Sequence, residues 1–480
     1  MNHASIIYII GKILQIEALF LSLPLLVALL YREGDYHAFL IPVVLCAVTG
    51  FLLSRKKPGK MVFYAKEGFV TVALGWIVMS LMGCLPFMLN GDIPGFTDAF
   101  FETISGFTTT GSSILNDVEV LSHGSLFWRS LTHWIGGMGV FVFLLAIMPM
   151  TGAHNMHLMR SESPGPDVGK LVPKLKNTAK LLYELYFALT VILIILLFIT
   201  GMNPFDALTI SFGTAGTGGF GVKNSSIAGY SALQQIIISV FMILFGVNFN
   251  FYYFLTAGKS IKTALKMEEV RVYFAVILVS TLIIMANARG FFTSLFDAFN
   301  KSLFQVASVI TTTGFATTDF DLWPTASKTV LFILMFIGAC AGSTGGGLKV
   351  SRVIIVFKMF HKEMSHFIHP RLVKGIHMGG KAVKDETVEG VKLYLVIFIV
   401  IYMISAFIIS FDDKGIDTSF TAVAATINNI GPGLSGVGPT RNFSDFSLLS
   451  KWVLMFDMLA GRLELYPMLL LFAPATWRKK

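Results

Sequence analysis

The sequence is poor in charge and in cysteine, and each shortage limits what the chain can be. Only 14% of its 480 residues are Asp, Glu, Lys or Arg, whereas 54% are hydrophobic and the mean hydropathy is +0.72. Soluble domains usually carry about 25% charged residues, so this composition excludes that class and predicts a membrane protein. The cysteines, Cys46, Cys84 and Cys340, lie in apolar stretches without metal-ligand spacing, and we expect them only to pack.

The sequence also lacks the motifs of common active sites. It contains no nucleophile elbow and no set of His, Cys or carboxylate residues with metal-binding spacing. It has neither a Walker A motif nor a Rossmann fingerprint, so any control by nucleotide would have to come from another subunit. We therefore expect no enzyme activity and no covalently bound cofactor.

What the sequence has instead is long apolar runs, and a helix needs about 20 such residues to cross a bilayer. Ten runs are predicted to cross, near 5–30, 37–53, 66–88, 124–150, 180–200, 232–256, 272–288, 326–360, 389–410 and 447–473. The first run is too long for a cleavable signal and has no small-residue cleavage site before Tyr31 and Arg32, so we expect it to remain as a membrane helix.

The formal net charge of +9 indicates topology rather than nucleic-acid binding, because Lys and Arg gather in alternate loops as the positive-inside rule requires. The basic loops lie at 55–60, 160–180, 259–271 and 349–392. The basic tail at 478–480 falls on the same side, so both termini are predicted to be cytoplasmic. The loops at 151–180 and 358–388 are long enough to dock a partner, although a solvated basic face would look the same.

A unit of apolar helix, short amphipathic segment, small-residue cluster and second apolar helix occurs four times. Asp98 and Asp206 each precede their glycine by thirteen positions, at 111 and 219, and Phe101 and Phe304 each precede theirs by ten, at 111 and 314. The pattern predicts an all-α membrane protein with an N-terminal two-helix domain and four pore repeats. The predicted boundaries are 1–60, 61–160, 161–265, 266–365 and 366–480.

Each short segment is expected to be a half-helix that enters the membrane and turns back. Three turns of helix at about 1.5 Å per residue cannot cross about 30 Å of hydrocarbon. Non-helical backbone at that depth is tolerated only where protein shields it or where it lines a watery cavity, so four such turns predict one central pore. The candidate N-caps are Thr97 or Asp98, Asp206, Asp297, and Asp417 or Thr418.

The chemistry of the four clusters suits a dehydrated monovalent cation. The C-terminal end of each half-helix carries partial negative charge, and the Thr and Gly residues after it offer backbone carbonyl oxygens. No Asp or Glu lies in the clusters. The alternative is that the small residues only let helices approach closely. The predicted potassium ligands are Thr109, Thr110, Gly111, Thr217, Gly218, Gly219, Thr312, Thr313, Gly314, Asn429, Ile430 and Gly431.

On these residues the chain resembles the Trk, Ktr and HKT superfamily of potassium transporters, and it is most similar to the bacterial TrkH and TrkG type. The segments that carry the resemblance are 98–112, 304–315, 342–347, 428–433 and 461–464. The resemblance implies potassium uptake across the bacterial cytoplasmic membrane, a homodimer, and a cytoplasmic TrkA-like ring that binds nucleotide. It also associates four filter glycines with potassium, whereas serine at the first position accompanies sodium preference in some plant members.

Two clusters depart from the fourfold pattern. The second has Gly218 where the first and third have Thr, and the fourth has Asn429 and Ile430. Because of these departures, we expect only moderate selectivity for potassium over sodium.

The apolar run after the third cluster contains too many glycines for a continuous helix. By the resemblance, the loop lies under the filter and obstructs the pore until a regulator moves it, although a passive kink is the alternative. Its predicted residues are Gly342, Ser343, Thr344, Gly345, Gly346, Gly347 and Lys349.

Three further residues are singled out. Arg462 lies in an apolar helix, so it is expected to face the permeation path as an electrostatic barrier, or else to pair with Glu464 or Asp457. Glu102 is expected to pair with a basic group, with attraction of cations as the alternative, and His133 is expected to pack. A symporter that couples potassium to protons or sodium by alternating access remains the rival to gated conduction.

Overall fold

The computed structural model describes residues 2–34, 36–58, 65–139, 175–256, 264–371 and 375–478. In these parts of the chain the regular structure is helical, apart from one short hairpin of β1 (His377–Met378) and β2 (Lys381–Ala382), in which His377 faces Ala382. Helices are expected where lipid is the solvent, because every backbone polar group must find its partner inside the segment.

The described residues contain six helices that are long and apolar enough to cross a membrane, or seven if one bent pair is a single span. These six are His3–Leu30, His37–Ser54, Lys66–Asn90, Lys180–Ile199, Glu268–Asn287 and Asp385–Asp412. They contain the helices α1 (His3–Leu30), α2 (His37–Ser54), α3 (Ala65–Gly83), α4 (Leu85–Asn90), α14 (Glu268–Asn287) and α18 (Asp385–Ile409), and most of α9 (Leu175–Ile199).

The other predicted crossings are shorter or broken. The run at 124–150 begins as α6 (His123–Met138), and its second half lies outside the described residues. The broken runs form α11 (Ala232–Phe245) with α12 (Phe249–Thr256), α16 (Thr325–Ile337) with α17 (Val350–Ile368), and α20 (Leu448–Arg462) with α21 (Tyr466–Phe472) and α22 (Pro474–Trp477). Short 3-10 turns lie at Arg289–Phe291, Phe320–Leu322, Ser410–Asp412 and Ser435–Val437.

The predicted crossings at 232–256 and 447–473 are interrupted in the structure, and a tertiary contact lies at the first break. α11 and α12 meet at 92°. At the bend the Gly246 carbonyl accepts the Cys340 N–H over 3.0 Å, and Phe249 donates its N–H to the Gly342 carbonyl over 3.1 Å. The backbone groups that a straight helix would pair internally are thus used by the distant segment 338–349, which hydropathy cannot reveal.

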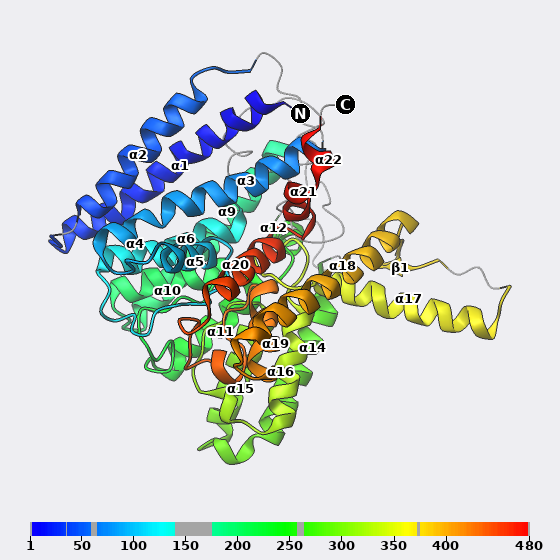
Figure 1. The fold of residues 1–480 in the computed structure, drawn as a ribbon. Coiled ribbons are helices and arrows are strands. Elements are labelled where there is room, and N and C mark those ends of the chain that lie inside the picture. The colour runs from blue at the N-terminus through cyan, green and yellow to red at the C-terminus, as the bar shows by residue number, and fades with distance from the viewer. Residues whose placement is uncertain are drawn as a thin grey trace.

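The N-terminal helices α1 and α2 form an antiparallel pair beside α3 (Figure 1). Glycines set how closely they approach, since a Cβ at Gly11 would lie 2.9 Å from the Gly50 carbonyl oxygen. Small residues at such crossings are a common means of helix packing in membranes.

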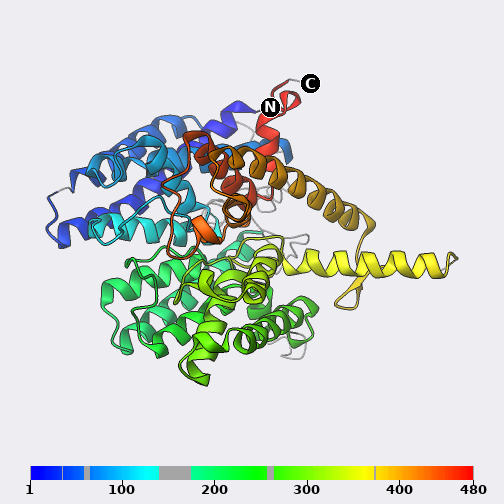
Figure 2. The same cartoon turned by 60° about the horizontal axis from the view of Figure 1, so that its bottom comes forward.

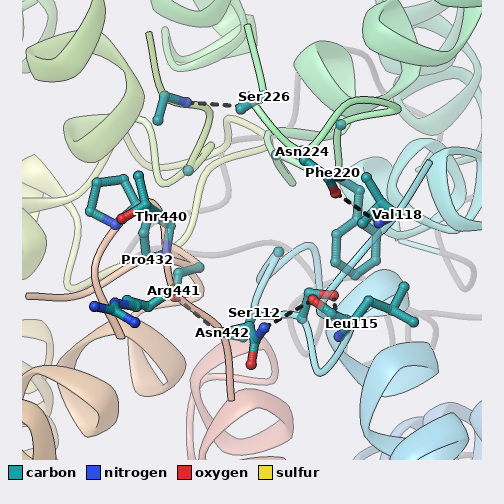
Figure 3. Close-up of a pocket in the computed structure, with 18 of the residues that line it drawn as sticks. Ser112, Leu115, Val118, Phe220, Asn224, Ser226, Pro432, Thr440, Arg441 and Asn442 are labelled. Atoms are coloured by element: carbon teal, nitrogen blue, oxygen red, sulfur yellow. Dashed lines mark hydrogen bonds between the residues drawn. The ribbon is translucent and has the colours of Figure 1, made fainter. Parts of the chain in front are cut away.

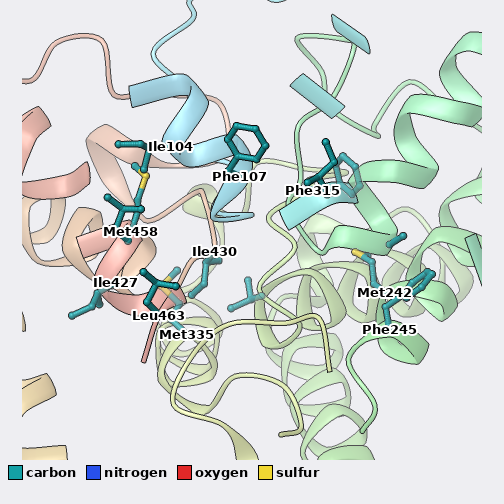
Figure 4. Packing of buried hydrophobic residues seen from close by; sticks show 14 of the residues in the cluster. Ile104, Phe107, Met242, Phe245, Phe315, Met335, Ile427, Ile430, Met458 and Leu463 are labelled. Carbon is teal, nitrogen blue, oxygen red and sulfur yellow. The ribbon is translucent and has the colours of Figure 1, made fainter. Parts of the chain in front are cut away.

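Four short helices lie among the long ones: α5 (Phe96–Phe107), α10 (Pro204–Gly216), α15 (Leu295–Ile310) and α19 (Ile416–Ile427). Figure 4 shows apolar side chains of α5, α19 and α20, including Ile104, Ile427 and Met458, packed around the ends of these helices. The predicted N-caps were wrong, because the N-cap residues are Gly95, Asn203, Ser294 and Gly415, two or three positions earlier than predicted. The acidic residues instead lie in the first turns, where they complement the helix dipole.

Helix α17 extends away from the rest of the molecule (Figure 2). Its outer half exposes large apolar side chains, with Phe357 at 70%, Phe360 at 66% and Phe367 at 78% exposure. The hairpin of β1 and β2 follows it in the chain.

Candidate functional site

The four short helices end in the same backbone motif. In each, the N–H of the residue before the predicted filter glycine reaches back to a carbonyl five positions earlier, which closes the last turn in the Schellman manner. These N···O distances are 2.9 Å for Thr110 to Ser105, 2.8 Å for Gly218 to Gly213, 2.8 Å for Thr313 to Ser308 and 2.8 Å for Ile430 to Ala425.

One residue in each motif has a left-handed backbone: Thr109, Thr217, Thr312 and Asn429 have φ between 54° and 57°. Three of them are threonines, and a β-branched residue in this region is a genuine outlier that costs of order 1–3 kcal/mol. Neighbouring groups hold these residues in place. Thr312 accepts the Gly346 N–H at its hydroxyl over 2.6 Å, and Asn429 donates from its amide to the Met458 carbonyl over 2.9 Å.

The predicted filter glycine follows two positions after the left-handed residue in each loop. These four glycines form a closed ring. All have positive φ, from 80° to 102°. A Cβ at each would run into the carbonyl oxygen that precedes the filter glycine of the next loop, so each loop contacts the next and the fourth contacts the first. The distances from that Cβ position to the facing oxygen are 2.0 Å for Gly111 to Gly218, 2.0 Å for Gly219 to Thr313, 2.1 Å for Gly314 to Ile430 and 2.8 Å for Gly431 to Thr110.

A cavity of about 210 Å³ opens on one side of this ring (Figure 3). All four filter glycines are among the residues that line it. Hydrogen bonds between distant loops build its rim: Val118 N–H to the Asn224 amide oxygen at 2.8 Å, and the Asn442 amide to the Leu115 carbonyl at 3.1 Å. The described residues that line it include Arg129, Lys223 and Arg441 but no Asp or Glu. The oxygens that line it are therefore those of hydroxyl, amide and carbonyl groups, not carboxylates.

Behind the first loop, Glu102 and Arg129 form a buried ion pair at 2.8 Å, with side-chain exposures of 0% and 2%. This confirms the expected structural role of Glu102. Arg129 also donates to the Gly221 carbonyl over 3.2 Å and lies 4.0 Å from the centre of the Phe220 ring. The pair therefore ties the first short helix to the second filter loop.

The interrupted segment 338–349 lies directly against two of the helix ends. A Cβ at Gly345 would lie 2.8 Å from the Thr311 carbonyl oxygen, and one at Gly346 would lie 2.5 Å from that of Asn428. This confirms the predicted break in the helix after the third cluster. Within the segment, Lys349 donates its ammonium to the carbonyls of Gly345 and Gly346.

Arg462 reaches the same segment from α20. Its guanidinium donates to the Thr344 carbonyl over 2.9 Å, to the Gly137 carbonyl over 2.8 Å and to the Gly136 carbonyl. It thereby joins the interrupted segment to α6 across the molecule. Of the two acidic partners considered for it, Glu464 pairs with Arg352, and Asp457 accepts from the Ser405 hydroxyl over 2.8 Å.

Sequence reasoning missed Glu269 as part of this site. Its carboxylate is 4% exposed, accepts the Ala341 N–H over 2.7 Å and accepts from the Asn248 amide over 3.3 Å. The neighbouring Glu268 pairs with Lys358 of α17 at 2.5 Å and accepts the Gly379 N–H of the hairpin over 2.8 Å. Two adjacent carboxylates at the start of an apolar helix were the only signal, and they looked like ordinary first-turn residues.

Together, the apolar helices and the ring of glycine turns define a membrane protein built around one central set of four short helices. A model of the TrkH family, described as cation transport protein, matches residues 37–479, and the chain belongs to that family.

Named relatives extend the match to the whole chain. The Trk system potassium uptake protein TrkH of Escherichia coli K12 is 36% identical, with 100% of both chains covered. TrkG of the same strain is 32% identical, with 99% of both covered. The crystal structure of the potassium transporter TrkH from Vibrio parahaemolyticus superposes with a TM-score of 0.89 at 33% identity and covers 100% of both chains.

Proposed function

We propose that this chain takes up potassium ions through a passage between the four glycine turns, which act as its selectivity filter. The closed ring of filter glycines is the observation that carries this proposal, since each loop contacts the next around one axis. The names of the relatives, which are potassium uptake proteins, support the choice of ion.

The oxygens available in the ring suit that ion. The carbonyls that precede the filter glycines stand beside the next loop, and the four short helices direct their negative C-terminal ends toward the same place. Backbone carbonyls of this kind replace the hydration shell of a monovalent cation. The twelve filter residues predicted from the sequence are the proposed ligands, and potassium is the substrate they hold in transit.

We further propose that the chain is organised as the N-terminal helix pair at 1–60 followed by four pore repeats at 61–160, 161–265, 266–365 and 366–480. The repeated helix-end motif supports this division, because the same hydrogen bonds and the same positive φ recur once in each repeat.

The segment 338–349 is the proposed gate. It contacts the ends of the third and fourth short helices, and the buried cationic groups of Lys349 and Arg462 bind its carbonyls. Two positive charges beside a cation path raise the electrostatic barrier to a permeating ion. The segment must move, or these charges must move with it, before potassium can pass freely.

Partners of the chain are proposed as a second copy and a TrkA-like nucleotide-binding ring on the cytoplasmic side, with the protein in the bacterial cytoplasmic membrane and both termini inside. The exposed phenylalanines of α17 support a protein partner, because large apolar side chains gathered on the exposed part of one helix are typical of an interaction surface. The relatives are named as parts of a Trk system, which fits a protein that works with other subunits.

The second candidate function is potassium transport coupled to protons or sodium. Two buried carboxyl groups support it. Glu17 of α1 is 2% exposed and has no hydrogen-bond partner among the described residues, and Asp457 of α20 is fully buried. Intramembrane carboxyl groups of this kind occur in proton relays.

Bilayer recording of the purified protein in mixed potassium and sodium tests both candidates. The pore hypothesis predicts single-channel current steps and a reversal potential set by the cation gradients alone. A reversal potential that shifts with the proton or sodium gradient at fixed potassium would establish coupling instead. Addition of the cytoplasmic partner, with and without nucleotide, tests the regulation.

A further inference from the structure

We infer that His133 determines the cation selectivity of the second filter loop, because its imidazole ring fills the space beside Gly218, at the position where the other three loops carry a side chain. The inference rests on the proposed filter function and names a residue on α6, outside the four loops. His133 was expected only to pack.

The second loop is the one that lacks a side chain before its filter glycine. Thr110, Thr313 and Ile430 occupy the equivalent position in the other loops, and all share with Gly218 the hydrogen bond to the carbonyl five residues earlier. Gly218 is not among the residues with positive φ, so its backbone conformation does not require glycine. The reason for glycine at this position must therefore be space.

The space is taken by the His133 ring. A Cβ at Gly218 would lie 2.2 Å from both Cγ and Nδ1 of His133, far inside van der Waals contact. The same helix position also packs against the end of α10, where a Cβ at Gly216 would lie 2.1 Å from the His133 carbonyl oxygen. Both the backbone and the imidazole ring of His133 therefore pack against the second short helix and its loop.

Both ring nitrogens are used, and the partners decide which one carries the proton. The Phe220 N–H can only donate, and it lies 3.2 Å from Nε2, so Nε2 accepts. The Gly106 carbonyl can only accept, and it lies 2.8 Å from Nδ1, so Nδ1 carries the proton and donates. The ring is therefore the neutral Nδ1–H tautomer, and it joins the first short helix to the second loop.

These contacts enclose the second filter glycine. Gly218 lies against the imidazole ring and the Phe220 N–H donates to it, so Gly219 sits between two residues that His133 contacts. The Gly218 carbonyl faces Gly111 in the first loop, where a Cβ would lie only 2.0 Å away. A shift of the imidazole would therefore move a carbonyl of the ring, and carbonyl positions set the discrimination between potassium and sodium.

The test uses the full-length protein in proteoliposomes, with the potassium to sodium permeability ratio taken from reversal potentials. His133→Ala should lower the ratio about 3- to 10-fold, the equivalent of one lost hydrogen bond. His133→Gln should keep it within about twofold, because its amide also offers an acceptor oxygen and a donor nitrogen. Gly218→Thr should abolish transport by clashing with the ring. The double variant His133→Ala with Gly218→Thr should regain transport, since the new side chain enters the vacated space.

A ratio unchanged in His133→Ala, together with normal transport by Gly218→Thr, would overturn the inference. If His133→Ala does not fold, His133→Gln and the double variant test the inference in its place. If both of these fold but do not transport, the inference is also contradicted. Gly111→Ser, measured in parallel, separates the two levels of the argument. If the permeability ratio changes in Gly111→Ser but not in the His133 variants, the proposed role of His133 is wrong and the filter proposal stands. If the ratio does not change in Gly111→Ser, the filter proposal itself is wrong.

Discussion

Gly346 in the interrupted segment donates its backbone N–H to the hydroxyl of Thr312 in the third filter loop, over 2.6 Å. Thr312 is one of the four residues held with a left-handed backbone, with φ of 57°. The proposed gate and the proposed filter are therefore joined by one buried hydrogen bond. Movement of the proposed gate would break this bond, which would couple it to the proposed filter.

Thr312→Val should loosen the gate. Valine has nearly the shape of threonine but accepts no hydrogen bond, so it leaves the buried Gly346 N–H unpaired at a cost of about 1–3 kcal/mol to the closed arrangement. We expect higher potassium flux in the absence of any partner, measured in proteoliposomes. Thr312→Ser keeps the hydroxyl and serves as the matched control. Equal flux in the valine and serine variants would contradict the link.

Arg462→Ala should raise basal cation flux, because it removes a charge from the proposed path and three hydrogen bonds to backbone carbonyls. Loss of a charge-assisted bond is worth about 1.5–3 kcal/mol, which corresponds to about 10- to 100-fold in the closed-to-open ratio. Single-channel open probability is the measurement, with Arg462→Lys as the charge-conserving control. A variant with normal flux but reduced yield would indicate a purely structural role.

Glu269→Ala should also release the gate, since the Ala341 N–H and the Asn248 amide both lose their acceptor. Glu269→Gln keeps one acceptor oxygen, so it should stay close to the wild-type flux. Glu268→Ala, one residue away, tests instead the contact of α14 with Lys358 of α17. If all three variants conduct alike, Glu269 does not hold the segment.

Gly111→Ser should weaken discrimination against sodium. A Cβ there would lie 2.0 Å from the Gly218 carbonyl oxygen at a φ of 80°, so the serine must push a ring carbonyl aside, with backbone strain of about 1–3 kcal/mol. Gly431→Ser should be milder, because its Cβ would lie 2.8 Å from the facing oxygen. The permeability ratio and the thermal melting temperature, measured for both variants, check the order. A larger effect at Gly431 would contradict the geometry.

The sequence by itself determined the membrane class, the four glycine clusters and the break between Ile337 and Val350. These are local properties: apolar composition selects the solvent, and glycine at a fixed position permits a turn or ends a helix whatever lies around it. Glu102 and Arg462 were also evident from the sequence, because an ionisable group within an apolar run stands out without any knowledge of its partners.

Only the tertiary structure decided which of these residues meet. Glu102 pairs with Arg129. The Cys340 N–H donates to the Gly246 carbonyl at the bend between α11 and α12. The Glu269 carboxylate accepts the Ala341 N–H. Gly218 departs from the sequence pattern of the other loops, and the structure explains this because the His133 ring occupies the space beside it. Each contact joins residues 27 to 94 positions apart in the chain, as from 102 to 129 and from 246 to 340. Composition and periodicity describe neighbours along the chain, whereas contacts over such distances depend on how whole helices pack.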